Sequence, residues 1–191
     1  MGTLKNSVFR MRGYTPIPLL ALMLILAETT PKRFIAGTAL GLVGEAVRIW
    51  SVSYAGMETR TRKVGAPRLV TSGPYAHLRN PIYLGNFLLG LGFCLATWAW
   101  MPWMVGIYIA GFLLQYSLII SLEETRLREL FGKQYEGYAQ AVPRFLPRLS
   151  PYRGEGRVKP NIRKALRSER DTFLSIAAAL ILVLLRWHLS G

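Results

Sequence analysis

The chain has 191 residues, of which 24 are Lys or Arg and 10 are Asp or Glu, so its formal net charge is +14. About half of the residues (51%) are hydrophobic, and they occur in long blocks with the charged residues between them. This pattern argues against a nucleic-acid-binding protein, a soluble enzyme and a disordered chain, and indicates one integral membrane domain. The single cysteine, Cys94, excludes an intrachain disulfide and zinc sites built on two or four cysteines.

Five apolar segments predict an all-α, polytopic transmembrane helical bundle over residues 1–191. The first segment is short, because a span needs about 20 residues at 1.5 Å each. It resembles a signal peptide, but Ile25 is too large for a cleavage site, so we expect a retained span. The link at 99–102 predicts a tight hairpin between the third and fourth spans. The predicted spans are residues 14–30, 34–54, 82–98, 103–122 and 172–189.

The second predicted span contains three glycines and two charged residues. Gly37, Gly41 and Gly44 have the spacing GxxxGxxG inside an apolar helix. No strand precedes them, so they indicate close helix packing rather than a dinucleotide-binding loop. Glu45 and Arg48 are three residues apart, and we expect them to pair within the membrane.

Basic residues outside the spans predict the orientation of the chain. Twenty Lys and Arg residues lie before the first span, in segment 55–81 or in segment 123–171, and three lie on the other side. The positive-inside rule therefore places the N-terminus and both segments in the cytoplasm, and the C-terminus on the opposite side. Six basic residues within 157–170 predict contact with anionic lipid, or recruitment of an anionic lipid substrate.

Residues 123–142 are predicted to form a helix that continues the fourth span and ends before Pro143. Glu123 and Glu124 lie at the start of this segment, where the apolar span ends. Adjacent residues do not share a helix face, so one carboxylate can point into a site. The other is then expected to face water or a nearby arginine, Arg126 or Arg128.

Three motifs surround the predicted hairpin. Residues 69–75 read LVTSGPY, residues 79–85 read RNPIYLG, and residues 123–127 read EETRL. Over about 55–147, the chain resembles the integral membrane methyltransferases of the isoprenylcysteine carboxyl methyltransferase and phospholipid methyltransferase family. Asn80 stands where the family often has histidine, and Pro67 stands where its eukaryotic members have one, so a mechanism that needs a basic imidazole at position 80 is not expected.

The resemblance implies methyl transfer from S-adenosyl-L-methionine to a lipophilic acceptor in the membrane. The acceptor is a prenylcysteine-like carboxylate, a phospholipid amine or another lipid, and no metal is required. Glu123 and Arg144 are the expected catalytic residues, with Arg144 placed to hold an anionic acceptor. The expected cofactor-binding residues are Leu69, Val70, Tyr75, Arg79, Asn80, Pro81, Tyr83 and Glu124.

Two other functions remain open at this stage. One is an NADPH-dependent, sterol-reductase-like membrane enzyme, in which Arg60, Arg62 and Lys63 would hold the 2′-phosphate. The other is a non-catalytic, lipid-binding member of the fold, which would suit the loss of histidine at Asn80. The expected partners are the bilayer and a lipophilic or lipidated substrate, with no nucleic acid. The acceptor and the oligomeric state are left open.

Overall fold

The computed structural model describes residues 13–56, 68–154 and 158–190, which form helices and connecting loops without a strand. The predicted all-α class is therefore confirmed for this part of the chain. Pro67 and the basic residues of 1–12 and 57–67 lie outside it. The helices are α2 (Ile17–Ile25), α3 (Pro31–Ala55), η2 (Gly73–Ala76), α4 (Pro81–Thr97), α5 (Trp103–Phe131), α6 (Lys133–Ala141), α7 (Ile162–Ser168) and α8 (Arg170–Ser190).

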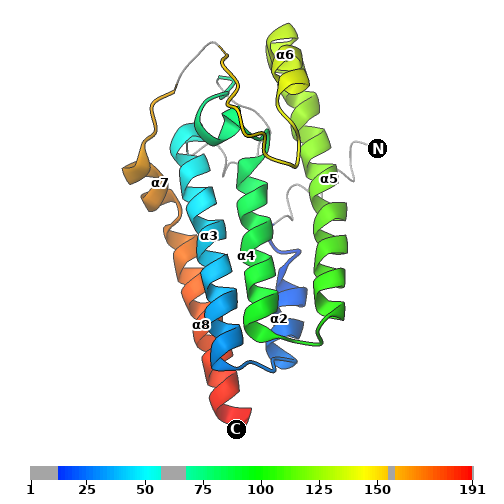
Figure 1. Ribbon diagram of the computed structural model, residues 1–191, viewed down its shortest axis with the longest axis vertical. Coiled ribbons are helices and arrows are strands. Elements are labelled where there is room, and N and C mark those ends of the chain that lie inside the picture. Colours follow the sequence, from blue (N-terminus) through cyan, green and yellow to red (C-terminus); the bar gives the residue numbers. More distant parts are fainter. Residues whose placement is uncertain (1–12, 57–67, 155–157, 191) are drawn as a thin grey trace.

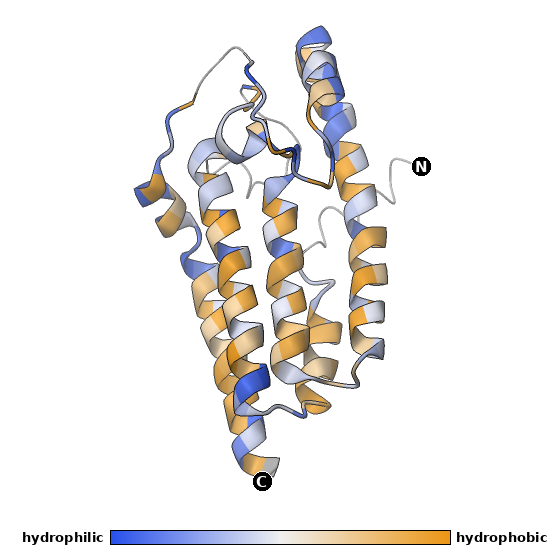
Figure 2. Ribbon diagram, in the orientation of Figure 1, coloured by the Kyte–Doolittle hydropathy of each residue, from blue (hydrophilic) through white to orange (hydrophobic). Residues whose placement is uncertain are grey.

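Four long helices form an antiparallel bundle, with the C-terminus at one end and α6 at the other (Figure 1). Three of them, α3, α5 and α8, are long and apolar enough to cross a membrane, and α4 is a shorter apolar helix of 17 residues. Figure 2 shows hydrophobic residues along these four helices and hydrophilic residues around α6. The chain is therefore an integral membrane protein with a polar layer at the α6 end.

Two predicted elements differ from the structure. The first predicted span contains only the nine-residue helix α2, which extends about 14 Å, roughly half of the hydrocarbon thickness. The helix predicted over 123–142 is interrupted at Gly132, where φ is +48° and α5 ends. Glycine adopts this left-handed conformation readily, and the chain turns there into α6.

Helices α3 and α4 pack backbone against backbone. A Cβ atom on Gly44 would lie 2.7 Å from the carbonyl oxygen of Gly85, and one on Gly92 would lie 2.5 Å from that of Gly37. Neither pair leaves room for a side chain. Because apolar burial does not drive helices together in lipid, such close contact is a main source of their association. The close packing predicted from the glycine spacing is confirmed.

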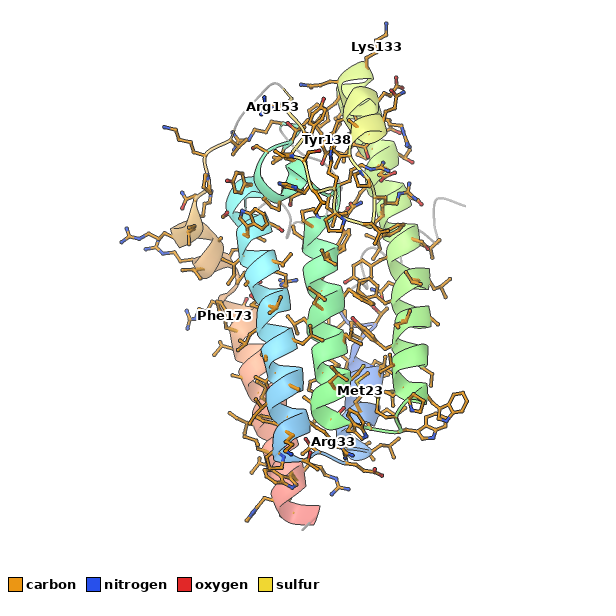
Figure 3. The ribbon with its side chains drawn as sticks, in the orientation of Figure 1. Met23, Arg33, Lys133, Tyr138, Arg153 and Phe173 are labelled. Carbon is orange, nitrogen blue, oxygen red and sulfur yellow. The ribbon has the colours of Figure 1, made fainter. Side chains whose placement is uncertain are left out.

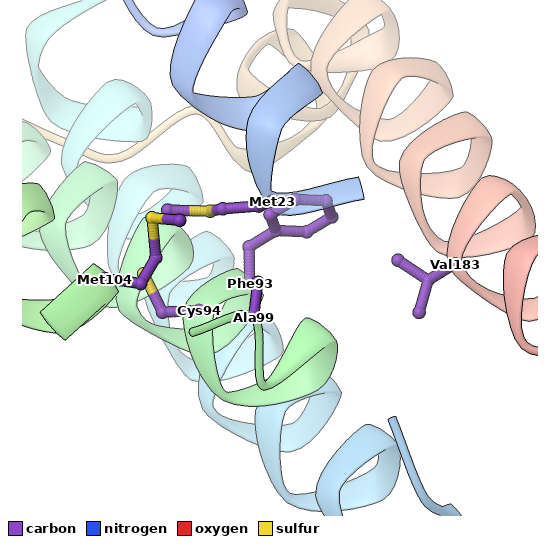
Figure 4. Packing of buried hydrophobic residues seen from close by; sticks show 6 residues of the cluster. All are labelled: Met23, Phe93, Cys94, Ala99, Met104 and Val183. Atoms are coloured by element: carbon purple, nitrogen blue, oxygen red, sulfur yellow. The ribbon is translucent and has the colours of Figure 1, made fainter. Parts of the chain in front are cut away.

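A buried apolar cluster closes the end of the bundle opposite α6. It joins α2, α4, α5 and α8 near the hairpin, and Figure 4 shows its side chains. The hydroxyl of Thr29 donates a hydrogen bond of 2.6 Å to the carbonyl oxygen of Ala96, which ties the α2–α3 connection to the same end. The cluster consists of Met23, Phe93, Cys94, Ala99, Met104 and Val183.

We expect Gly37→Ala to lower the melting temperature of the detergent-purified protein, because the new Cβ would overlap the backbone of α4 at Gly92 and Ala96. Overpacking of this kind costs about 1–3 kcal/mol. Gly41→Ala is the matched control, since it lies one turn along the same helix and its Cβ would meet nothing within 4 Å. Equal melting temperatures for the two variants would contradict the close α3–α4 contact.

Candidate functional site

Two segments cover the ends of α4 and α5 on the α6 side of the bundle. Residues 68–80 precede α4, and residues 142–153 follow α6. Their backbones are joined where Arg79 donates to the Pro143 carbonyl at 3.0 Å and Arg148 donates to the His77 carbonyl at 3.0 Å. Tyr152 donates in the same way to Ala76 at 2.9 Å. Side chains from both segments therefore meet at the end of α5.

The carboxylate of Glu124 is the centre of this region and is only 2% exposed. Arg79 approaches its Oε1 with Nη1 at 2.9 Å, and Arg144 binds both oxygens, with Nε 3.1 Å from Oε1 and Nη2 against Oε2. Arg128, one turn along α5, lies 3.8 Å from Oε2. One buried carboxylate is thus surrounded by three guanidinium groups, which leaves positive charge in excess.

Glu123 lies beside this cluster and has a different environment. The hydroxyl of Tyr83, on the first turn of α4, donates a hydrogen bond of 2.6 Å to Glu123 Oε1. The Tyr83 ring packs against that of Tyr116, with ring centroids 4.7 Å apart. Glu123 is partly buried, and the Tyr83 hydroxyl orients its carboxylate.

Tyrosine side chains pack between the two segments. The Tyr138 hydroxyl donates a hydrogen bond of 2.8 Å to the Tyr75 carbonyl, and Leu69 packs against the cluster formed by Tyr135, Tyr138 and Val142. Burial raises the pKa of both Tyr75 and Tyr138 far above the usual tyrosine value. The negative charge of Glu123 shifts the pKa of Tyr75 further in this direction. These phenols therefore remain protonated at neutral pH.

Arg79 has a second neighbour besides Glu124, the side chain of Tyr135. Burial raises the pKa of Tyr135, and a hydrogen bond from Arg79 partly offsets that rise. The hydrogen bond to Glu124 raises the pKa of Arg144, so its guanidinium stays charged. Tyr135 was not predicted as a site residue. Its place among the apolar residues of the predicted helix over 123–142 was a sequence signal for it.

The structure brings most of the predicted site residues together, but not all. Asn80 precedes α4 without a side-chain capping bond, and its Nδ2 lies 3.5 Å from the Arg144 carbonyl. Asn80 therefore contacts the segment after α6 and does not cap α4 through its side chain. Pro81 begins α4 and is buried, which makes it a structural neighbour of Arg79. Val70 is partly buried beside Leu69.

A second polar cluster lies within the bundle. Arg48 donates through Nε to Glu45 at 3.0 Å, which confirms the predicted pair, and through Nη2 to Glu169 at 2.6 Å. It also contacts the side-chain oxygen of Asn86, whose amide donates to the Tyr116 hydroxyl at 3.0 Å. Glu169 was missed because it lies 121 residues from Arg48 in the sequence. The cluster ties the start of α8 to α3 and α4.

The sequence model of the phospholipid methyltransferase family matches residues 32–134. The chain is 34% identical over 139 residues to the cobalt-zinc-cadmium resistance protein CzcN of Cupriavidus metallidurans, covering 71% of this chain and 57% of that protein. It is 30% identical over 138 residues to the nickel-cobalt-cadmium resistance protein NccN of Alcaligenes xylosoxydans xylosoxydans, covering 71% and 58%.

The chain is also 27% identical over 129 residues to a protein-S-isoprenylcysteine O-methyltransferase of Tribolium castaneum, covering 61% of this chain and 42% of that protein. It therefore spans roughly half of the length of these three relatives. No solved structure matches the chain.

We expect Glu124→Gln to destabilise the protein, because it leaves the Arg79 guanidinium, whose side chain is only 14% exposed, without its compensating charge. Removing one partner of a buried ion pair costs about 3 kcal/mol or more. Glu129→Gln is the control on the same helix, since Glu129 is 56% exposed and pairs with the exposed Arg126, a pair worth at most about 1 kcal/mol. Thermal unfolding in detergent measures both, and a Glu124→Gln variant as stable as Glu129→Gln would contradict the buried charge cluster.

Proposed function

Since this chain belongs to the phospholipid methyltransferase family, we propose that it transfers a methyl group from S-adenosyl-L-methionine to a lipophilic acceptor in the membrane. Its relatives include protein-S-isoprenylcysteine O-methyltransferases, which supports methyl transfer as the reaction class. The donor supplies an activated sulfonium methyl group when bound. The positive-inside rule favours a cytoplasmic location for the α6 end and hence for the site.

The observation that carries the proposal is the environment of Glu123. Its carboxylate is oriented by the Tyr83 hydroxyl at 2.6 Å and lies next to a cluster with excess positive charge. The amino-acid part of the donor has an ammonium and a carboxylate, so it requires adjacent groups of opposite charge. We assign the ammonium contact to Glu123 rather than Glu124, because three arginines already surround Glu124.

Glu124 then acts on the donor through its arginine neighbours. By pairing with Arg79 and Arg144 it fixes the direction of their guanidinium groups. Arg79 and Asn80 are placed at the start of α4, where nitrogen donors can meet the carboxylate of the donor. Tyr75, Leu69 and Val70 supply the apolar surface that an adenine ring requires. Holding the reactants in line and excluding water is the main catalytic contribution expected of these side chains.

For the acceptor, the excess of arginine favours an anionic group. Arg144 is the candidate to hold it, because its side chain is 34% exposed while its charge is maintained by Glu124. A carboxylate is already ionised at pH 7, whereas an amine with a pKa near 10 must first lose a proton. The protonated tyrosines and Asn80 offer no base for that step. An oxygen acceptor, as in the O-methyltransferase relatives, therefore suits the site better than an amine.

Two relatives are named for metal resistance, but the described part of this chain offers little to bind a metal ion. Within residues 13–56, 68–154 and 158–190, no group of three or more His, Cys, Asp or Glu side chains is arranged to hold one. We therefore base the proposal on the methyltransferase relatives.

We expect the wild-type protein in detergent to bind S-adenosylhomocysteine at one site per chain, measured by isothermal titration calorimetry. Glu123→Gln should weaken this binding roughly tenfold or more, because a charge-assisted hydrogen bond is lost. Glu129→Gln, the exposed control, should bind as the wild type does. Methyl transfer from labelled donor into a lipid extract then identifies the acceptor.

The alternative results separate the competing functions. A folded wild-type protein that binds NADPH but not S-adenosylhomocysteine would favour the reductase, and one that binds neither would favour a non-catalytic lipid-binding protein. Binding that is unchanged in Glu123→Gln would retain the methyltransferase proposal but remove Glu123 as the ammonium ligand.

A further inference from the structure

Helix α7 lies at the side of the bundle, at the level where the neighbouring spans end (Figure 1). The backbone N–H of Asn161, just before α7, donates a hydrogen bond of 2.8 Å to Ser53 in the last turn of α3. At the other end of α7, helix α8 begins at Arg170, and its exposed apolar side chains start at Phe173 and Leu174.

One face of α7 is fixed against the bundle. Ala165 and Glu169 are each 1% exposed and Ser168 is 8% exposed. Glu169 is paired with Arg48 of α3 at 2.6 Å. Helical hydrogen bonds continue across the junction, from Glu169 to the Ala165 carbonyl and from Phe173 to the Glu169 carbonyl, both at 2.9 Å. The opposite face of α7 is therefore held in a constant direction.

That opposite face is basic and exposed. Arg163, Arg167 and Arg170 recur at spacings of four and three residues, which places them on one side of the helix, and Lys164 lies next to them. No ion pair within the described residues neutralises any of these four side chains. Ile162 and Leu166, 59% and 44% exposed, lie one turn apart between the basic face and the buried face.

We propose that this basic face of α7 and the start of α8 is a binding surface for the headgroups of anionic phospholipids. Arginine guanidinium groups match phosphate in charge and geometry, and the face lies beside the last turn of α3 and the first turn of α8, where these two apolar helices end. The exposed Ile162 and Leu166 suit the boundary between headgroups and acyl chains, as in interfacial amphipathic helices. A soluble nucleic acid or acidic protein would not account for these two apolar side chains.

The inference is independent of the methyltransferase proposal, because α7 lies outside residues 32–134 and packs on α3 and α8. Its role is to attach the segment between the site and α8 to the membrane surface. Each basic residue near an anionic surface adds to binding, and the interaction weakens with salt.

The test uses the full-length protein in a neutral detergent, with dioleoyl phosphatidylglycerol and dioleoyl phosphatidylcholine as probes. Melting temperature and lipid retention in native mass spectrometry are measured for each. The variant Arg163→Gln/Arg167→Gln removes two charges from the α7 face. The variant Lys133→Gln/Arg153→Gln removes the same charge at the α6 end, further from the spanning helices (Figure 3).

We expect phosphatidylglycerol to stabilise the wild type and the α6-end control more than phosphatidylcholine does. In the α7 variant, apparent binding of phosphatidylglycerol should weaken on the order of tenfold. Equal responses to the two lipids in the wild type would overturn the proposal. So would an α7 variant with undiminished phosphatidylglycerol binding, which would place the lipid elsewhere, for example at Arg144. Stabilisation by inorganic phosphate alone would indicate a site for free anions instead of lipid.

Discussion

The buried carboxylate of Glu124 holds together three parts of the chain that are distant in sequence. It comes from α5, it pairs with Arg79 at the start of α4, and it pairs with Arg144 in the segment that follows α6. A carboxylate that is 2% exposed is stable as an anion only when such partners compensate its lost hydration. The direction of Arg79 and Arg144 and the position of the covering segment all depend on this one charge.

Below this layer, the bundle relies on two kinds of contact that a bilayer permits. Glycines allow the backbones of α3 and α4 to approach closely. Van der Waals packing then holds the two helices together, since a bilayer provides no hydrophobic driving force between them. Arg48 then pairs with Glu45 and Glu169, which attaches α8 to α3 through a buried ionic cluster. The first contact sets the separation of α3 and α4. The second places α7 and α8 beside them.

The family match and the site overlap only in part. Residues 32–134 include α3, α4 and α5, with Arg79, Glu123 and Glu124. Arg144 and the helices α7 and α8 lie beyond it. The core of the proposed donor site is thus expected to be common to the family, whereas Arg144 and the basic face of α7 are features through which this chain can differ in the proposed acceptor and in the proposed contact with lipid.

Periodicity and composition alone were enough to predict the all-α membrane bundle, the glycine packing and the Glu45–Arg48 pair. These features depend on residues close in sequence or on one helix face, where spacing determines contact. The motifs around Arg79 and Glu123 also indicated which residues gather at the site. Spacing could not predict the break at Gly132 or the short length of α2, because both depend on how the ends of the helices pack.

Only the tertiary structure decided how the charges are distributed. From the sequence, Glu123 was an expected catalytic residue and Glu124 an expected cofactor-binding residue. In the fold, Glu124 is surrounded by three arginines, and Glu123 accepts a hydrogen bond from the Tyr83 hydroxyl. Arg144 reaches Glu124 because the segment after α6 runs back to α5. In the same way it brings Glu169 to Arg48 across 121 residues. Pairing between charges that are distant in the chain follows from chain topology, so it leaves no local sequence pattern. The sequence therefore determines the residue types, and the fold determines their partners.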